Sequence, residues 1–287
     1  MQPTRDIPLP WARKDIEQRL GFTGARFTGV NAKLTALIGA LCTVIFYVVL
    51  YWIDGGPLSG VVEMFTERGP TPYAICFFTF WSLAILAIKW RKVVFQRKVL
   101  NYSIVPDTAD FVLSAGTTDS VSNKIYTIVD EPKYFVLFNR IMIALSNLRN
   151  LGRVADVEEI LRSQAENDEA TMESSYTLVS GFVWAIPVLG FIGTVLGLSA
   201  AISGFGPALE NAQELSVLKD SLREVTGGLA TAFQTTLEAL VAALMIQLLI
   251  TFLRKSEEDF LDACSSYCLR NIVNRLRIMI YEEEAPQ

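Results

Sequence analysis

Four long apolar stretches dominate the pattern of hydrophobic and polar positions, and polar segments separate them. The stretches cover residues 34–53, 72–88, 177–201 and 228–253. The first holds about 20 residues without a charge, which at 1.5 Å rise per residue is enough helix to cross a hydrocarbon core. The chain is therefore predicted to be an all-α, polytopic membrane protein with four transmembrane helices.

The polar segments between these stretches predict the rest of the organisation. Residues 11–21 read as a short amphipathic helix at a membrane surface rather than a signal peptide, because no small-residue cleavage site follows. Long helices are expected to extend into the cytoplasm, and a short outer-surface helix is expected to begin near Pro207. The predicted regions are an N-terminal segment 1–33, a hairpin of spans one and two 34–90, a helical cytoplasmic segment 91–175, spans three and four 176–253, and a C-terminal helix 254–287.

The distribution of lysine and arginine predicts the orientation of the spans. Six of these residues lie in 1–33, eleven in 89–175 and five after residue 253, against one in 54–71 and two in 204–227. Cytoplasmic flanks accumulate lysine and arginine, whereas short translocated loops do not. Both termini are therefore expected in the cytoplasm, in a multi-pass membrane protein.

Composition removes several classes of function. Hydrophobic residues make up 51% of the chain, and the formal net charge of -5 is spread without a basic block, so nucleic acid is not expected as a partner. Histidine is absent, which excludes catalytic triads that use it and any zinc site that contains it. The four cysteines read as reduced residues. No catalytic residue, metal site or cofactor is expected, and the chain is predicted not to be an enzyme.

Two stripes of small residues, one on each of spans three and four, are the most distinctive feature of the sequence. Their members recur at steps of three and four, so each stripe occupies one helical face with a threonine near its middle. The first stripe is Pro187, Gly190, Thr194, Gly197 and Ala201, and the second is Gly228, Ala232, Thr236, Ala239 and Ala243.

Two interpretations of the stripes stay open. Small faces let membrane helices approach closely, and the stripes, together with Gly193, could serve packing alone. The sharper interpretation is a narrow polar path between subunits, because a threonine hydroxyl can replace part of the hydration shell of an ion. Pro187 could kink its helix or free a backbone carbonyl for an ion or a water.

Glu238 is a strong acid near the centre of span four, where a charge costs several kcal/mol unless it is paired, hydrated or protonated. At 100° per residue it lies about 200° from Thr236, closer in phase to Thr235. A structural hydrogen bond, a proton relay and a contact with a cavity all remain possible for it. Thr194, Thr236, Thr235 and Glu238 are the candidate ion-pathway residues. The candidates for helix flexing and close packing are Pro187, Gly190, Gly193, Gly197, Ala232 and Ala239.

The string IPVLGFIGTVLGL in span three, followed by GGLATAFQTTLEALVAAL in span four, resembles the MotA/TolQ/ExbB proton-channel family over roughly residues 140–255. The resemblance implies a pentameric ring around two copies of a single-span partner of the MotB/TolR/ExbD type, whose span bears an aspartate. By the same resemblance, Thr194 and Thr236 would line the path beside that aspartate, and Pro187 would lie where the helix flexes. Ala239, where the family often has glycine, and Glu238, where it has an apolar residue, depart from its pattern.

The resemblance favours the channel-forming subunit of a motor in the bacterial inner membrane that converts an ion motive force into rotation or mechanical work. The transported ion could be a proton or sodium, and the load is open between flagellar torque, gliding, outer-membrane energising and defence against phage. A passive ion channel, or a helical scaffold without motor activity, is the alternative. Two spans before the long cytoplasmic segment are typical of the four-span flagellar stators, whereas the string in span three is closer to TolQ and ExbB.

Overall fold

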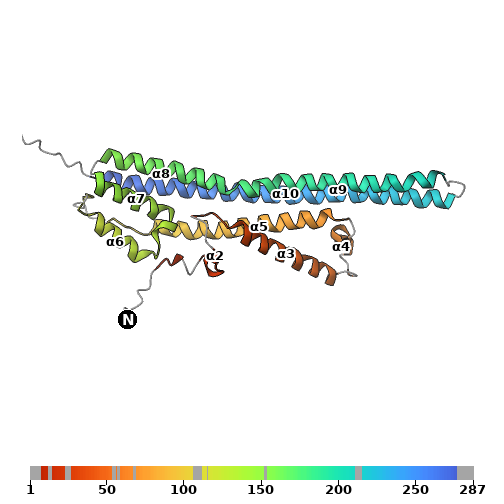
Figure 1. Ribbon diagram of the computed structural model, residues 1–287, viewed down its shortest axis with the longest axis horizontal. Helices are drawn as coiled ribbons and strands as arrows, with labels where there is room; N and C mark the ends of the chain where they lie inside the picture. The colour runs from red at the N-terminus through yellow and green to blue at the C-terminus, as the bar shows by residue number, and fades with distance from the viewer. Residues whose placement is uncertain are drawn as a thin grey trace, which may run out of the picture. The chain divides into compact units, whose positions relative to one another are not determined.

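The computed structural model is helical in nearly all of the chain that it describes (Figure 1). Among those residues the extended backbone is confined to two isolated β-bridges, so the predicted all-α class is confirmed. Four helices are long and apolar enough to cross a membrane, as predicted. The described residues are 8–11, 15–22, 27–53, 56, 59–66, 69–105, 112–114, 116–151, 154–210 and 215–276.

The chain divides into two compact units. The first consists of Met1–Asn31, Ile88–Ser175 and Leu253–Gln287, and the second of Ala32–Ala87 and Tyr176–Phe252. The divisions fall after Asn31, Ala87, Ser175 and Phe252. The second unit therefore collects the four apolar stretches, and the first collects the polar segments.

The second unit, called the membrane unit below, is built on four long helical segments. Its elements are α3 (Ala32–Ile53), α4 (Ser59–Thr66), the first part of α5 (Thr71–Arg97), α9 (Thr177–Glu210) and much of α10 (Leu215–Asn271). Figure 1 shows α9 and α10 running side by side. Many large apolar side chains of α3, α9 and α10 point outward, as expected of helices whose solvent is lipid.

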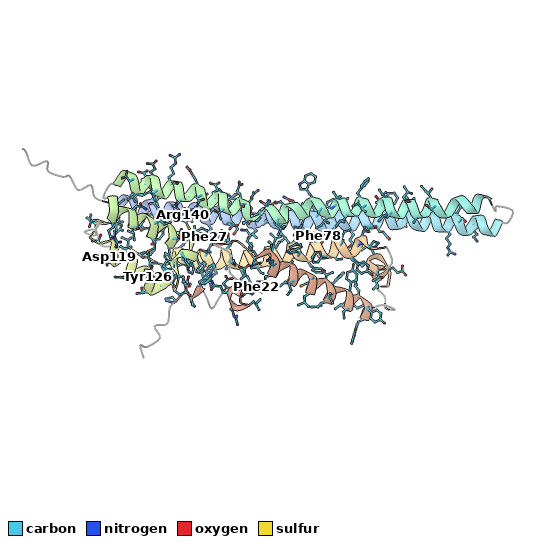
Figure 2. All side chains as sticks on the ribbon, in the orientation of Figure 1. Phe22, Phe27, Phe78, Asp119, Tyr126 and Arg140 are labelled. Carbon is cyan, nitrogen blue, oxygen red and sulfur yellow. The ribbon has the colours of Figure 1, made fainter. Side chains whose placement is uncertain are left out.

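Aromatic and small residues hold α3, α5 and α9 together within the membrane unit. The rings of Trp81 and Phe182 have centroids 4.6 Å apart, and Phe78, labelled in Figure 2, lies 5.1 Å from Phe182. A methyl group added at Gly39 would place its carbon 2.7 Å from the Cα of Trp81. Glycine at this position therefore lets α3 and α5 approach to backbone contact.

The segment between spans three and four differs from the prediction. We predicted a separate short helix starting near Pro207, but α9 continues without a break to Glu210 and α10 begins at Leu215. Residues 211–214 lie outside the described chain. A proline removes one backbone donor from a helix, and here α9 passes both Pro187 and Pro207.

The first unit, called the polar unit below, is a bundle of shorter helices. It holds α2 (Ile16–Arg19), η1 (Lys98–Asn101), α6 (Thr118–Ile128), η2 (Pro132–Tyr134), α7 (Val136–Leu151), α8 (Val154–Ser175), η3 (Val273–Arg275), and the ends of α5 and α10. Helix α7 packs on both α6 and α8. Its apolar side chains Leu137, Phe138 and Ile141 are fully buried and form the centre of the unit.

The N-terminal segment is folded into the polar unit. Trp11 is 1% exposed, and its ring lies parallel to that of Tyr134 at 5.6 Å and edge-on to that of Phe135 at 5.2 Å. The backbone nitrogen of Trp11 donates to Oδ1 of Asp130 at 2.8 Å. Helix α2 spans four residues, and residues 12–14 of the predicted amphipathic stretch lie outside the described chain. The described part is thus anchored by burial of Trp11.

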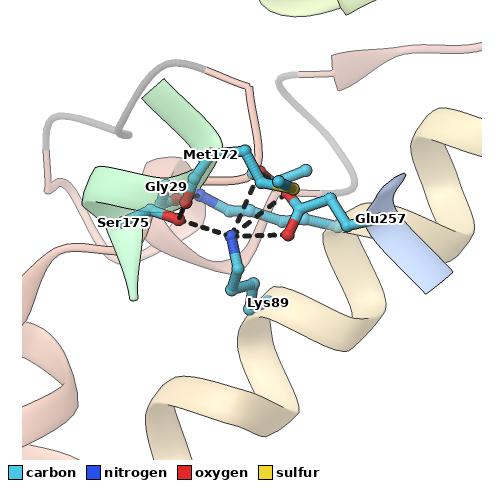
Figure 3. Close-up of polar contacts among 7 residues, drawn as sticks. Gly29, Lys89, Met172, Ser175 and Glu257 are labelled. Atoms are coloured by element: carbon cyan, nitrogen blue, oxygen red, sulfur yellow. Dashed lines mark hydrogen bonds and ion pairs between the residues drawn. The ribbon is translucent and has the colours of Figure 1, made fainter. Parts of the chain in front are cut away.

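A buried lysine ties three separate parts of the chain together within the polar unit (Figure 3). Nζ of Lys89 lies 2.9 Å from a carboxylate oxygen of Glu257 and donates to Oγ of Ser175 at 2.7 Å. The hydroxyl of Thr28 donates to the same carboxylate. Lys89 and Glu257 are each 1% exposed. Charges this deeply buried are tolerated only when they are paired and hydrogen-bonded, as they are here.

Two more buried cations in the polar unit follow the same rule. Lys92 lies 2.6 Å from Glu17 and donates to the carbonyl oxygen of Gly29 at 2.8 Å. Nε of Arg140, which is labelled in Figure 2, donates to Oδ2 of Asp168 at 2.6 Å. The polar unit is therefore held by ion pairs as well as by apolar packing.

Candidate functional site

The two small-residue stripes meet each other inside one chain. A carbon added at Gly190 of α9 would lie 2.5 Å from the Cβ of Ala239 of α10, and one added at Gly228 would lie 2.6 Å from the Cβ of Ala201. A carbon added at Gly197 of α9 would lie 3.2 Å from the carbonyl oxygen of Gly228 on α10. Neither helix could approach so closely if the glycines carried side chains.

The small residues of the stripes were predicted to serve close packing, and several of them lie at the contact between α9 and α10. Ala232 and Ala239 are 3% and 0% exposed, and Gly193 lies against the side chain of Thr235. Pro187 is half-buried within the unbroken helix α9. Since proline has no backbone N–H, it cannot donate to the carbonyl of Val183 one turn earlier. That carbonyl marks a point where the helix can bend or bind a donor.

Thr236 joins the two helices by a hydrogen bond across the contact. Its hydroxyl donates either to the carbonyl oxygen of Gly190 on α9 or to that of Ala232 on its own helix, each at 3.3 Å. Because a hydroxyl has one proton and two lone pairs, its oxygen can still accept from water or coordinate a cation. Thr236 is half-buried, so this oxygen is not sealed within the chain.

Thr194 lies in the stripe of α9, between Gly190 and Gly197. Its hydroxyl donates to the carbonyl oxygen of Phe191 at 2.6 Å. The side chain is half-exposed in the single chain, and its lone pairs are likewise available to an ion or a water. The two threonines of the stripes thus share one state, with the hydroxyl proton committed to a backbone carbonyl.

Thr235 and Glu238 lie on α10 but outside its stripe of small residues. Thr235 is 1% exposed and lies against Gly193, close to Thr71 at the start of α5. Glu238 is 9% exposed, and its Oε1 lies 3.7 Å from Sγ of Cys76 on α5. The structure thus brings Thr235 to the contact with α9 but places Glu238 against α5, away from the Gly190–Ala239 contact. This agrees with the angle of about 200° expected between Thr236 and Glu238.

The surroundings of Glu238 are compact and weakly polar. Oε2 of Glu238 is buried and makes no hydrogen bond to the described residues, while Cys76 is a free cysteine. A thiol is a weak donor, so one carboxyl oxygen rests on a weak contact and the other on none in this chain. Such a group is kept within a bilayer when it is protonated or meets a further partner.

The buried ion pairs of the polar unit were missed by the sequence analysis. Lys89, Lys92 and Gln96 follow one another at steps of three and four, so they occupy one face of α5. All three side chains are buried, together with Val93 and Val99. A cation repeated at helical spacing among buried apolar positions was the available signal, but its anionic partners come from distant segments. The sequence alone could not pair them.

Comparison with known proteins identifies the region that contains this site. The family described as the MotA/TolQ/ExbB proton channel family matches residues 138–265, which contain most of α7, all of α8 and α9, and most of α10. No curated protein and no solved structure matches the chain. The matched family is one of channels rather than enzymes, and the four apolar helices indicate a multi-pass membrane protein. The resemblance found in spans three and four is therefore confirmed, and residues 138–265 belong to the MotA/TolQ/ExbB proton channel family.

Proposed function

We propose that this chain is the channel-forming subunit of an ion-driven motor in the inner membrane. The observation that carries the proposal is the contact between α9 and α10 within the matched region. There, Thr194 and Thr236 interrupt two otherwise small and apolar stripes with hydroxyls whose lone pairs stay available. Hydroxyl oxygens at such positions can replace part of the hydration shell of a proton carrier or a sodium ion.

The proposed assembly is a homopentameric ring around two copies of a single-span partner of the MotB/TolR/ExbD type. Large apolar side chains on the outward faces of α9 and α10 support contacts with other subunits as well as with lipid. Trp184, Phe191 and Phe233 are 80%, 66% and 66% exposed in the single chain. An aspartate in the partner's span would receive the ion beside the two threonines. Both termini and the polar unit would lie in the cytoplasm, as the lysine and arginine counts favour.

The energy available suits a stepping motor. One elementary charge that crosses 100 mV releases about 2.3 kcal/mol. That is enough to favour one of two ring positions of nearly equal energy, about fiftyfold for a single ion, since about 1.4 kcal/mol corresponds to a factor of ten. Rotation of the ring around its partner would follow from repeated loading and release of the partner's aspartate.

The experiment is ion flux into proteoliposomes that contain the full chain together with a single-span protein of the MotB/TolR/ExbD type from the same organism. Thr194→Val and Thr236→Val keep the shape of each side chain and remove the hydroxyl, so each should lower partner-dependent flux at least tenfold. Thr251→Val is the matched control, because its hydroxyl also donates to a carbonyl of its own helix, that of Gln247 at 2.9 Å, on an exposed face of α10. Flux that persists in both stripe variants, or that needs no partner, contradicts the motor.

Glu238→Gln in the same assay separates the roles considered for that residue. Its position against Cys76 on α5 supports a structural contact, so flux should stay within about twofold of the unchanged protein. A loss as large as that of Thr236→Val would instead assign Glu238 to the proton path. Flux measured with sodium and with protons as the only permeant cation identifies the coupled ion.

A further inference from the structure

A groove with an unusual lining lies in the polar unit where α5 leaves its apolar stretch. It has a volume of about 480 Å³ and is formed between the N-terminal segment and the last turns of α5. The apolar run of α5 ends at Ile88, and the groove is lined by α5 residues between Ile88 and Phe95 and by Lys98 at the start of η1. Along the helix axis, the groove therefore begins where the hydrocarbon of a bilayer gives way to headgroups.

Three cations of this groove have no anionic partner among the described residues. Arg19, Arg91 and Lys98 line it, are exposed, and form no ion pair or hydrogen bond with a described carboxylate. Lys92 also lines it but is neutralised by Glu17 at 2.6 Å and by Asp15 at 3.7 Å. Asp15, the carboxylate in the lining, thus pairs with Lys92 and with none of the three exposed cations. The groove keeps a surplus of positive charge.

The cations stand beside exposed apolar side chains. Trp90 and Val94, which line the groove, are 51% and 44% exposed, and Leu20, next to Arg19 in the chain, is 57% exposed. Phe22, labelled in Figure 2, is 36% exposed on the same N-terminal segment. Tryptophan, lysine and arginine are the residues that collect at the depth of the headgroups. Water alone does not account for this combination of unpaired charge and apolar surface.

We propose that this groove is a binding site for an anionic phospholipid. The phosphodiester and the remaining headgroup charge would lie among Arg19, Arg91 and Lys98, and the first part of an acyl chain would lie along Trp90 and Val94. Guanidinium groups suit the phosphate because they donate in a planar fork. The apolar flank explains why a lipid fits and a free phosphate does not. The proposal does not rest on motor activity and concerns a part of the chain apart from α9 and the stripes.

Native mass spectrometry of the full-length protein in detergent tests the site. The protein is titrated with dioleoyl phosphatidylglycerol, with dioleoyl phosphatidylcholine, and with phosphatidylglycerol in the presence of inorganic phosphate. We expect saturable binding of the anionic lipid, at least tenfold weaker binding of the zwitterionic lipid, and no competition by millimolar phosphate. Equal binding of the two lipids overturns the proposal, and displacement by phosphate reassigns the groove to a free anion.

Charge-removing variants assign the binding to the groove. Arg19→Gln, Arg91→Gln and Lys98→Gln should each weaken the anionic lipid about fivefold, the change that about 1 kcal/mol per basic residue near an anionic surface gives. The matched control combines Lys124→Gln, Arg149→Gln and Arg270→Gln, which removes three other exposed charges of the polar unit. The triple variant Arg19→Gln/Arg91→Gln/Lys98→Gln removes all three charges of the groove, and a control triple variant that weakens binding as much as this one overturns the assignment. All six side chains are exposed, and gel filtration shows whether the variants keep their assembly.

Fluorescence quenching supplies a second readout that needs no charge change. In bilayers with brominated phosphatidylglycerol, the protein should be quenched more than in bilayers with the same fraction of brominated phosphatidylcholine. Trp90→Phe should remove most of this excess quenching, because Trp90 is 51% exposed at the groove, whereas Trp11, which also lines it, is 1% exposed. Trp11, Trp52, Trp81 and Trp184 remain in this variant. Excess quenching that survives undiminished in Trp90→Phe places the anionic lipid elsewhere and contradicts the proposal.

Discussion

The two units of this chain bury their helices by opposite means. In the polar unit, three cations are 1–5% exposed, and each is satisfied by a carboxylate from a distant segment. In the membrane unit, α9 and α10 meet through glycine and alanine, and the hydroxyl of Thr236 donates across the contact to the carbonyl oxygen of Gly190. This difference in packing follows from the solvent of each unit, which is water for the polar unit and lipid for the membrane unit. Outside a bilayer, ion pairs can select one arrangement among apolar alternatives, whereas in lipid close backbone approach replaces the hydrophobic effect.

The same contrast applies to the two buried carboxylates that matter most. Glu257 receives Lys89 and the hydroxyl of Thr28, so its charge is compensated. Glu238 has the thiol of Cys76 beside one oxygen, and its other oxygen has no partner among the described residues. The first carboxylate holds three parts of the chain in place, and the second has capacity left over for a proton or a partner. The charge of Glu257 is thus compensated within the chain, whereas that of Glu238 is not compensated by the described residues.

The largest expected effect comes from breaking the Lys89–Glu257 pair. Lys89→Met leaves Glu257 buried without its cation, so we expect a loss of about 3–5 kcal/mol in the free energy of unfolding, or failure to fold. The double variant Lys89→Met/Glu257→Leu removes both charges and should recover most of that loss. Thermal unfolding of the detergent-solubilised protein measures both. If the single variant is as stable as the double, the pair does not hold the polar unit.

A smaller effect is expected from crowding the contact between α9 and α10. Gly190→Ala would bring two Cβ atoms within 2.5 Å, so the helices must separate, at a cost of about 1–3 kcal/mol. The reciprocal change Ala239→Gly in the same chain should restore the unfolding midpoint. Gly181→Ala is the control on the same helix, because a methyl group there meets nothing within 4 Å. A destabilised Gly181→Ala, or no rescue by Ala239→Gly, would contradict direct packing at this point.

The membrane unit was largely predictable because its determinants are local. Apolar runs define the spans, and steps of three and four place Gly190 and Gly197 on one face and Ala232 and Thr236 on another. What hydropathy could not say is that the two faces contact each other within one chain rather than a neighbouring subunit. Small residues permit close approach to any helix, so the pattern does not identify the partner.

The polar unit was largely unpredictable because its determinants are distant in the sequence. Lys89 and Glu257 are 168 residues apart, and Trp11 reaches Asp130 across 119. The charges of residues 91–175 are typical of a solvated surface, and nothing local marks Arg140 or Asp168 as buried. The prediction of a separate outer helix starting near Pro207 was wrong for a related reason. Polar residues after Pro207 indicate a surface, but they do not show whether the preceding helix ends there.

The smallest effect is expected at Asp15, a buried carboxylate of the polar unit with one oxygen that has no hydrogen-bond partner among the described residues. Burial raises the pKa of Asp15 above its ordinary value, although Lys92 and the backbone N–H of Glu17 act in the opposite direction. A raised pKa in the folded state means that protonation of Asp15 favours folding. This stabilisation is complete below the ordinary pKa of 3.8 and is lost as the pH rises through the raised value.

Asp15→Asn keeps the cap of α2, because asparagine caps a helix as well as aspartate does, and it removes the charge that burial disfavours. At neutral pH the variant should therefore equal or slightly exceed the unchanged protein in stability, by less than about 1 kcal/mol. The difference should shrink as the pH falls toward 4, because the unchanged protein then gains the proton that the variant does not need. Chemical unfolding of both proteins across this range measures it. A variant that is clearly less stable than the unchanged protein at neutral pH would mean that Lys92, rather than burial, dominates at Asp15.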